Sequence, residues 1–170
     1  LQADDAAGAL AEVGKILETH PDIGAAHYLR GEALRRTDDL DGAEAAFRRA
    51  MDLEPAQEGV RGSLGGVLLA RGDAMRAAGD EGGAEALYRE ALENIDAQLA
   101  QTPEDVASLT NRAVVVERIG GEADAEEVLK SLEAVVEVSP ENLPARLRLA
   151  NAYVSAGRGS DAYALLDAAP

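Results

Sequence analysis

A pattern of small and aromatic residues between Ala43 and Pro55 most constrains what this chain can fold into. Ala43, Phe47 and Ala50 fall on one stripe of a helix, because they are four and three residues apart. Small side chains on both sides of an aromatic ring allow a neighbouring helix to approach closely, and Pro55 stops the helix. Gly31 precedes Ala43 by twelve residues, and altered copies of the whole pattern recur three more times.

The recurrence of this pattern defines a unit of two helices. In three of the four copies, the small residue of the first helix precedes the alanine of the second-helix stripe by twelve residues. The exception is the offset from Gly65 to Ala84, which is nineteen. The small residues align as Gly31, Gly65, Ala113 and Ala150, the alanines as Ala43, Ala84, Ala125 and Ala162, and the terminating prolines as Pro55, Pro103 and Pro140.

The pattern resembles the tetratricopeptide repeat family, whose unit is a helix–turn–helix of about 34 residues. The segment 24–57 is most similar to it, and departs from it at His27 and Arg30, where the family has a large aromatic residue and a leucine. The resemblance implies an all-α fold, a right-handed α-solenoid of antiparallel helix hairpins with about nine helices. The family positions are matched by Gly31, Leu34, Leu40, Ala43, Phe47, Ala50 and Pro55.

We expect one array over residues 1–170. It comprises a half repeat at 1–23, a repeat at 24–57, an elongated repeat at 58–105, a repeat at 106–142 and a terminal, truncated repeat at 143–170. No segment alternates with a period of two, so no strand is expected. The expected helices cover about 4–19, 24–36, 40–53, 58–78, 81–101, 106–119, 122–138, 142–156 and 159–168.

The elongated repeat has two interpretations. In the first, both helices are longer by seven residues, about two turns or roughly 10 Å, and form one long hairpin. In the second, the first helix breaks at Gly72 and Asp73, where an ordinary repeat would turn. We favour the long hairpin, because the segment 79–83 (Gly-Asp-Glu-Gly-Gly) is the stronger turn signal.

The composition excludes several classes of partner. A net charge of −16 repels nucleic acid and anionic lipid, and no apolar run approaches the ~20 residues that span a membrane. Lys15 and Lys130 are the only lysines among 16 basic residues, which favours a GC-rich bacterial genome. The sequence has no cysteine, so cysteine usage does not indicate whether the protein resides in an oxidising or a reducing compartment. We favour a location in the cytoplasm, with the periplasm as the alternative.

No arrangement of residues typical of catalysis is found, so we expect neither an enzyme nor a cofactor. The sequence has no phosphate-binding glycine loop after a strand and no G-x-S-x-G motif. His20 and His27 are the only histidines and are expected on different helices, so no metal site is predicted.

A stack of helical hairpins offers a concave groove lined by the first helix of each pair. Helical spacing identifies the face opposite the packing stripe, and we expect a peptide or protein segment to bind there. The candidate groove residues are Tyr28, Glu32, Arg35 and Arg36 in the first full repeat, Gly62, Gly66 and Leu69 in the elongated repeat, Thr110, Val114 and Arg118 in the next, and Leu147 and Asn151 in the last.

These residues would make two kinds of contact. The arginines would pair with carboxylates of a ligand or, equally well, with acidic residues of the protein itself. Apolar anchoring would come from Tyr28, Leu69, Val114 and Leu147.

Three glycines, Gly59, Gly62 and Gly66, share one face of the first helix of the elongated repeat. Each glycine inside a helix lowers helix stability by about 1 kcal/mol relative to alanine, so three glycines on one face require an explanation. The face is a low floor for a ligand backbone, or else it reflects tight contact with the previous hairpin or neutral drift in a glycine-rich sequence. We favour the second explanation, contact or drift, over the first.

Some tetratricopeptide repeat proteins clamp the terminal carboxylate of chaperones with lysine and asparagine at fixed groove positions. This chain has Tyr28 and Glu32 at the corresponding positions, so chaperone binding is not expected.

Two other functions stay open. Neither end of the array has the polar outer face that terminal repeats normally carry, and Leu165 and Leu166 are available on the last helix. We expect a fragment of a longer array, and the alternative is self-association into a homo-oligomer, through the uncapped ends or the long hairpin of the elongated repeat. The chain could also be a regulatory or recruiting segment of a larger multidomain protein.

Overall fold

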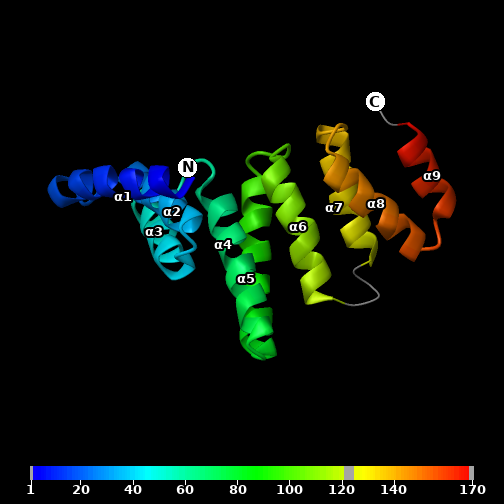
Figure 1. Cartoon of the computed structure of the whole chain (residues 1–170), viewed down its shortest axis with the longest axis horizontal. Coiled ribbons are helices and arrows are strands. Elements are labelled where there is room, and N and C mark those ends of the chain that lie inside the picture. Colours follow the sequence, from blue (N-terminus) through cyan, green and yellow to red (C-terminus); the bar gives the residue numbers. More distant parts are fainter. Residues whose placement is uncertain (1, 121–124, 169–170) are drawn as a thin grey trace. The chain divides into compact units, whose positions relative to one another are not determined.

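The computed structural model describes residues 2–120 and 125–168, and their regular structure is entirely helical. The described helix ends lie within two residues of the expected ones, apart from the expected start at 122, which lies outside the described residues. The helices are α1 (Gln2–Thr19), α2 (Gly24–Arg36), α3 (Leu40–Leu53), α4 (Val60–Ala77), α5 (Glu81–Leu99), α6 (Val106–Ile119), α7 (Ala125–Val138), α8 (Leu143–Ser155) and α9 (Gly159–Asp167), as Figure 1 shows.

The chain divides into two compact units, and the boundary between them falls within the sequence of α5. The first unit spans Leu1–Asn94 and the second Ile95–Pro170. In the first, α2 packs against α1, α3 and α4; in the second, α7 packs against α6 and α8, and α8 against α9. The expected single array and its repeat boundaries stay predictions.

Among the described residues, one in the left-handed backbone region follows the first helix of each hairpin. Asp38 (φ 63°) follows α2, Gly79 (φ 89°) follows α4, Gly120 (φ 67°) follows α6 and Gly157 (φ 74°) follows α8. A left-handed residue lets the chain reverse directly after a helix, and glycine adopts it without steric cost. Two of the following helices are capped by aspartate: the Asp39 carboxylate accepts from the Gly42 N–H (2.9 Å) and Asp80 from the Gly83 N–H (2.9 Å).

A glycine under an aromatic ring fixes how the two helices of a hairpin approach each other. A Cβ on Gly31 would lie 2.5 Å from Cε1 of Phe47, and a Cβ on Gly72 would lie 2.6 Å from Cε1 of Tyr88. Both glycines precede their ring by sixteen residues. Gly72 is therefore the counterpart of Gly31, and the alignment on Gly65 is wrong by seven residues.

The corrected alignment makes the repeat regular. Gly72 precedes Ala84 by twelve residues, as in the other three copies, and precedes the left-handed Gly79 by seven, as Gly31 precedes Asp38. The glycines differ by almost two full turns of helix, so Gly65 lies on the same face as Gly72 and satisfies the same sequence pattern.

The elongated hairpin is continuous. Helix α4 passes through Gly72 without a break and turns at Gly79, which confirms the long-hairpin interpretation. Helix α4 is five residues longer than α2, and α5 is five residues longer than α3, rather than the expected seven. The additional residues of α4 precede Gly72 at the start of the helix, and those of α5 follow Tyr88 at its end. The hairpin is therefore extended away from its turn.

Small and aliphatic residues, together with a few aromatic rings, fill the cores of both units. In the first, Phe47, Tyr88, Leu64 and Leu68 are the largest fully buried side chains. In the second, one cluster combines α6, α7, α8 and α9, and a smaller one lies beside it. The first cluster contains Ala113, Leu129, Leu132, Leu149, Ala150, Tyr153 and Ala162, and the second contains Leu109, Val135 and Ala145.

We expect Gly72→Ala to destabilise the protein. The added methyl group meets the rigid ring of Tyr88, whose hydroxyl also donates a hydrogen bond to Asp73 (2.8 Å), so the ring cannot move aside cheaply. The cost of overpacking, about 1–3 kcal/mol, exceeds the gain in helix propensity of about 1 kcal/mol. Gly82→Ala is the matched control, since its Cβ would meet no atom within 4 Å. Equal urea midpoints for the two variants would contradict the assignment of Gly72.

Candidate functional site

In the first unit, the expected groove residues of α2 lie against α4. The Tyr28 hydroxyl oxygen is 3.4 Å from the position of a Cβ on Gly59, and the Glu32 carboxylate accepts a hydrogen bond from Ser63 Oγ (2.8 Å). Tyr28 and Glu32 are half-buried. Part of their surface therefore packs one hairpin on the next, and only the remainder can meet a ligand.

The arginines at the end of α2 differ in their surroundings. Arg35 donates a hydrogen bond to the Glu32 carboxylate (3.0 Å). For Arg35, the structure therefore agrees with the alternative that the arginines pair with acidic residues of the protein itself. Arg36 is exposed and makes no ion pair with any residue that the structure describes. Arg36 is thus the cation of this face that can still pair with a partner.

The glycine-bearing face of α4 is used in part for packing. Gly59 precedes α4 with φ of 81°, a conformation that side chains rarely adopt, and Tyr28 approaches it closely. For this glycine, tight contact with the previous hairpin is the explanation. Gly62 and Gly66 are half-buried, while Leu69 is only 8% exposed and belongs to the core.

In the second unit, the expected groove residues come from α6 and α8. Thr110 and Val114 on α6 are half-buried, and the Thr110 hydroxyl donates to the carbonyl of Val106 (2.7 Å). Arg118, at the end of α6, is also half-buried and interacts with other residues. Arg148 on α8 donates to Glu117 on α6 (2.9 Å), which ties the two helices together.

Helix α8 presents the most apolar open surface of the second unit. Leu143 (59%), Leu147 (47%) and Val154 (63%) are exposed, with Asn151 on the same side. Their spacing of four, four and three residues forms one stripe, which we call the α8 stripe (Leu143, Leu147, Asn151, Val154). Leu143 was not among the expected groove residues, although its i, i+4 spacing to Leu147 is the signal that could have identified it.

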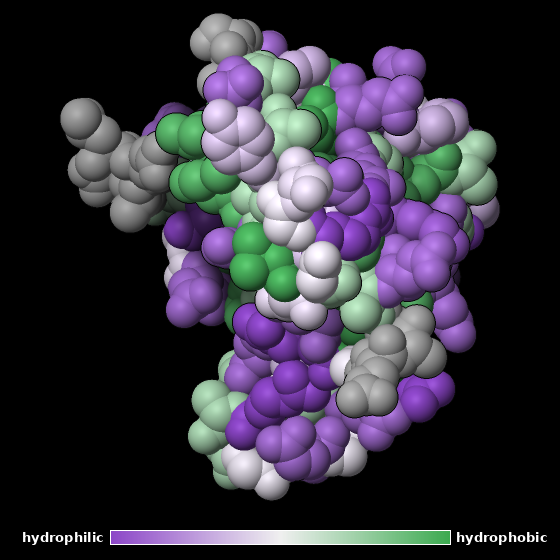
Figure 2. Space-filling view, turned by 90° about the vertical axis from the view of Figure 1, so that its right-hand side faces the viewer, coloured by the Kyte–Doolittle hydropathy of each residue, from purple (hydrophilic) through white to green (hydrophobic). Residues whose placement is uncertain are grey.

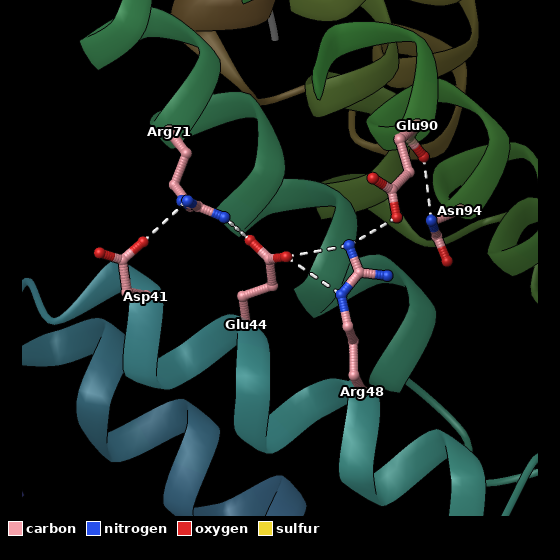
Figure 3. Close-up of polar contacts among 6 residues, drawn as sticks. All are labelled: Asp41, Glu44, Arg48, Arg71, Glu90 and Asn94. Carbon is pink, nitrogen blue, oxygen red and sulfur yellow. Dashed lines mark hydrogen bonds and ion pairs between the residues drawn. The ribbon is translucent and has the colours of Figure 1, made fainter. Parts of the chain in front are cut away.

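A ladder of charges joins α3, α4 and α5 in the first unit (Figure 3). Arg71 on α4 pairs with Asp41 (2.8 Å) and Glu44 on α3. Arg48 on α3 donates to Glu44 (2.9 Å) and pairs with Glu90 on α5 (2.7 Å). The Glu90 carbonyl accepts in turn from the Asn94 amide (2.9 Å). Glu44 stands at the centre, because it accepts from both arginines.

Arg112 plays the same part in the second unit. It pairs with Asp96 on α5 (2.7 Å) and Glu127 on α7 (2.7 Å), and donates to Ser131 (2.7 Å). Burial by itself would lower the pKa of Arg112, but the two paired carboxylates outweigh it and raise the pKa above its ordinary value. These contacts make Arg112 a structural cation rather than a free one.

Arg146 and Tyr153 are polar residues that are buried in the second unit. Arg146 is buried, and its guanidinium donates to the carbonyls of Pro140 (3.2 Å) and Leu165. The Tyr153 hydroxyl donates to Glu133 (2.7 Å), and burial together with this bond raises the pKa of Tyr153 to about 12. Both hold helices together, and neither is placed for chemistry.

Among the residues that the structure describes, no group of three or more histidine, aspartate or glutamate side chains could hold a metal ion. Within the same residues, no helix combines the length and the apolar character that crossing a membrane requires.

We expect Glu44→Gln to lower the free energy of unfolding by about 1–2 kcal/mol, because two arginines lose their shared carboxylate. Glu85→Gln is the matched control: Glu85 also pairs with an arginine four residues on (2.6 Å), but at the surface, and should cost less than about 0.5 kcal/mol. Chemical denaturation of both variants measures the difference. An equal loss of unfolding free energy in the two variants would show that the ladder stabilises the protein no more than a surface ion pair does.

Comparisons with known families identify the repeats. Models of the family described as tetratricopeptide repeat match residues 1–58 and residues 121–170, which together make up more than half of the chain. No curated protein sequence matches the chain.

Solved structures share the fold at low sequence identity. A MamA structure from Desulfovibrio magneticus RS-1 is similar with a TM-score of 0.76 and 18% identity, over 95% of this chain and 82% of that one. YrrB, described as a tetratricopeptide repeat protein with an unusual peptide-binding site, gives 0.70 and 19%, over 96% and 76%. The first such domain of Spaghetti (RPAP3), bound to an HSP90 peptide, gives 0.52 and 17%, over 79% and 95%.

The left-handed turns, the glycine–aromatic contacts, the family matches and these all-α neighbours agree on a helical repeat solenoid. The chain belongs to the tetratricopeptide repeat family.

Proposed function

We propose that this chain is a non-enzymatic protein-interaction module that binds a peptide or protein segment on the exposed face of its first helices. The observation that carries the proposal is the α8 stripe. Its leucines and valine are exposed, whereas the opposite side of α8 supplies Ala145, Leu149 and Ala150 to the core. Packing within the unit therefore does not account for the stripe.

The surroundings of the α8 stripe favour an extended segment or an amphipathic helix. Val114 and Thr110 on the neighbouring helix α6 are half-buried and add apolar and hydroxyl surface, and Asn151 offers an amide to a ligand backbone. Leu147 stands between Leu143 and Asn151 and is the anchor that we assign to the partner.

The first unit has an open first-helix face of its own, which is more polar. Arg36 would pair with a carboxylate of the partner, while Tyr28 offers the exposed part of its ring. Gly62 and Gly66, which are half-buried, would belong to this face of the first unit, whereas the core residue Leu69 is not included in it.

Two relatives support a peptide as ligand. YrrB is described as having a peptide-binding site, and the Spaghetti domain holds an HSP90 peptide. Tyr28 and Glu32 stand where members that clamp a terminal carboxylate have lysine and asparagine, so we propose an internal segment rather than a carboxylate terminus.

We expect Leu147→Glu to abolish partner binding without unfolding the protein, because the side chain is exposed and contributes contact area rather than core. Proteins captured from the source organism by the immobilised wild type would be identified by mass spectrometry and compared with those captured by the variant. Tyr163→Glu, an equally apolar-to-acidic change at an exposed site on α9, is the matched control and should retain the partner. Retention of the same partner by Leu147→Glu would rule out the α8 stripe.

A second candidate function is self-association through α9. Tyr163 (72%) and Leu166 (43%) are exposed on this helix, while Leu165 is half-buried against the neighbouring core cluster. Figure 2 views the structure from the side on which α9 is drawn in Figure 1, and shows hydrophobic side chains interspersed with polar ones. This surface would join two copies, or join the chain to the rest of a larger protein that it regulates or serves.

Multi-angle light scattering over a range of concentrations tests this second candidate. If α9 joins two copies, the mass should rise toward that of a dimer with concentration, and Leu166→Glu should return it to about 17.7 kDa. The Leu147→Glu variant should behave as the wild type. A monomer at all concentrations would exclude self-association and leave the peptide-binding proposal untouched.

A further inference from the structure

An apolar cleft lies between α1 and α2, on a side of the first unit that the proposed binding surface does not use. The cleft has a volume of about 470 Å³. Arg30 and Leu34 line it from α2, and lie roughly 200° around that helix from Tyr28 and Glu32. The α1–α2 cleft is lined by Leu10, Gly14, Leu17, Glu18, Arg30 and Leu34.

The lining residues make the cleft a groove that runs along the two helices. Leu10, Gly14 and Leu17 lie at i, i+4 and i+7 on α1, and Arg30 and Leu34 at i and i+4 on α2. Since seven residues of helix span about 10 Å, the groove is about two turns long. A docked helix with apolar residues at i, i+3 or i+4, and i+7 has the matching spacing.

Gly14 keeps the groove open. A Cβ at this position would meet no atom within 4 Å, so the glycine is not needed for close packing inside the protein. Glycine inside a helix costs about 1 kcal/mol relative to alanine. The space over Gly14 is therefore free for a side chain of a partner.

The rim of the groove carries two charges of opposite sign. Glu18 on α1 and Arg30 on α2 are both exposed, and neither makes an ion pair with any described residue. The neighbouring Lys15, by contrast, pairs with Glu12 (2.7 Å). A partner helix lying in the groove would have one flank beside Glu18 and the other beside Arg30.

We propose that the α1–α2 cleft binds an amphipathic helix of a partner protein, with a leucine-rich stripe in the groove, a basic residue against Glu18 and an acidic residue against Arg30. Apolar contact supplies the affinity, and the two charges fix how the helix lies. This site is separate from the α8 stripe and does not depend on the function proposed for it.

Synthetic helical peptides of about fifteen residues serve as probes, since seven residues already span the groove. The first carries a leucine stripe flanked by lysine on one side and glutamate on the other, the second has glutamine on both flanks, and the third has serine in place of leucine. Fluorescence anisotropy with the whole chain should show binding of the first, binding about three- to tenfold weaker for the second, and none for the third.

Gly14→Leu fills the groove and should weaken binding of the first peptide at least tenfold, while raising the melting temperature through better helix propensity. Gly8→Leu is the matched control: Gly8 lies on the same helix, also in open space, but does not line the cleft, so binding should stay within twofold of the wild type. Glu18→Gln with Arg30→Gln, both at exposed positions, should reduce the preference for the charged peptide to less than twofold.

Three results would overturn the proposal. The first is unchanged binding by Gly14→Leu. The second is loss of peptide binding in Leu147→Glu instead, which would place the probe on the α8 stripe. The third is self-association, detected by light scattering, that Gly14→Leu removes while peptide binding persists, which would make a second copy the occupant of the cleft.

Discussion

The contact between a glycine and an aromatic ring sixteen residues later sets the geometry of the first unit. Because Gly31 and Gly72 have no side chain, Phe47 and Tyr88 lie directly on the backbone of the preceding helix. The distance between the two helices then leaves room only for alanines on the rest of the stripe, and these are fully buried. In the second unit, Ala113 and Leu129 have the same spacing of sixteen residues, with alanine in place of glycine and leucine in place of the aromatic residue.

The sequence predicts the helices well because their ends are marked by residues with strong local preferences. Asp39, Asp105 and Asn142 accept hydrogen bonds from the first turns of their helices, and glycines close the turns. The register of the elongated repeat could not be read in the same way. Gly65 and Gly72 differ by almost two whole turns, so both lie on one face. The twelve-residue offset to Ala84 already favours Gly72, and the position of the Tyr88 ring against Gly72 decides between them.

The candidate surface was predictable as a face but not as a set of accessible residues. Helical spacing places Tyr28 and Leu69 on the first-helix face, yet their exposure depends on how closely the next helix approaches. Leu69 is covered, while Leu147 is open. The sequence pattern also does not predict which arginines form ion pairs within the protein. Arg35 and Arg36 are adjacent in sequence, and only Arg35 has an ion pair with a described residue.

The use of arginine explains why apolar surfaces stand out in so acidic a chain. Arg48, Arg71 and Arg112 pair with carboxylates of neighbouring helices, so their charges are neutralised between helices and an excess of carboxylates remains. A surface covered by carboxylates is strongly hydrated and repels other acidic surfaces. The α8 stripe and the floor of the α1–α2 cleft lack this cover, so a partner that buries them loses little hydration of charge. Apolar contact at these two places would therefore contribute most of the free energy of the binding that we propose.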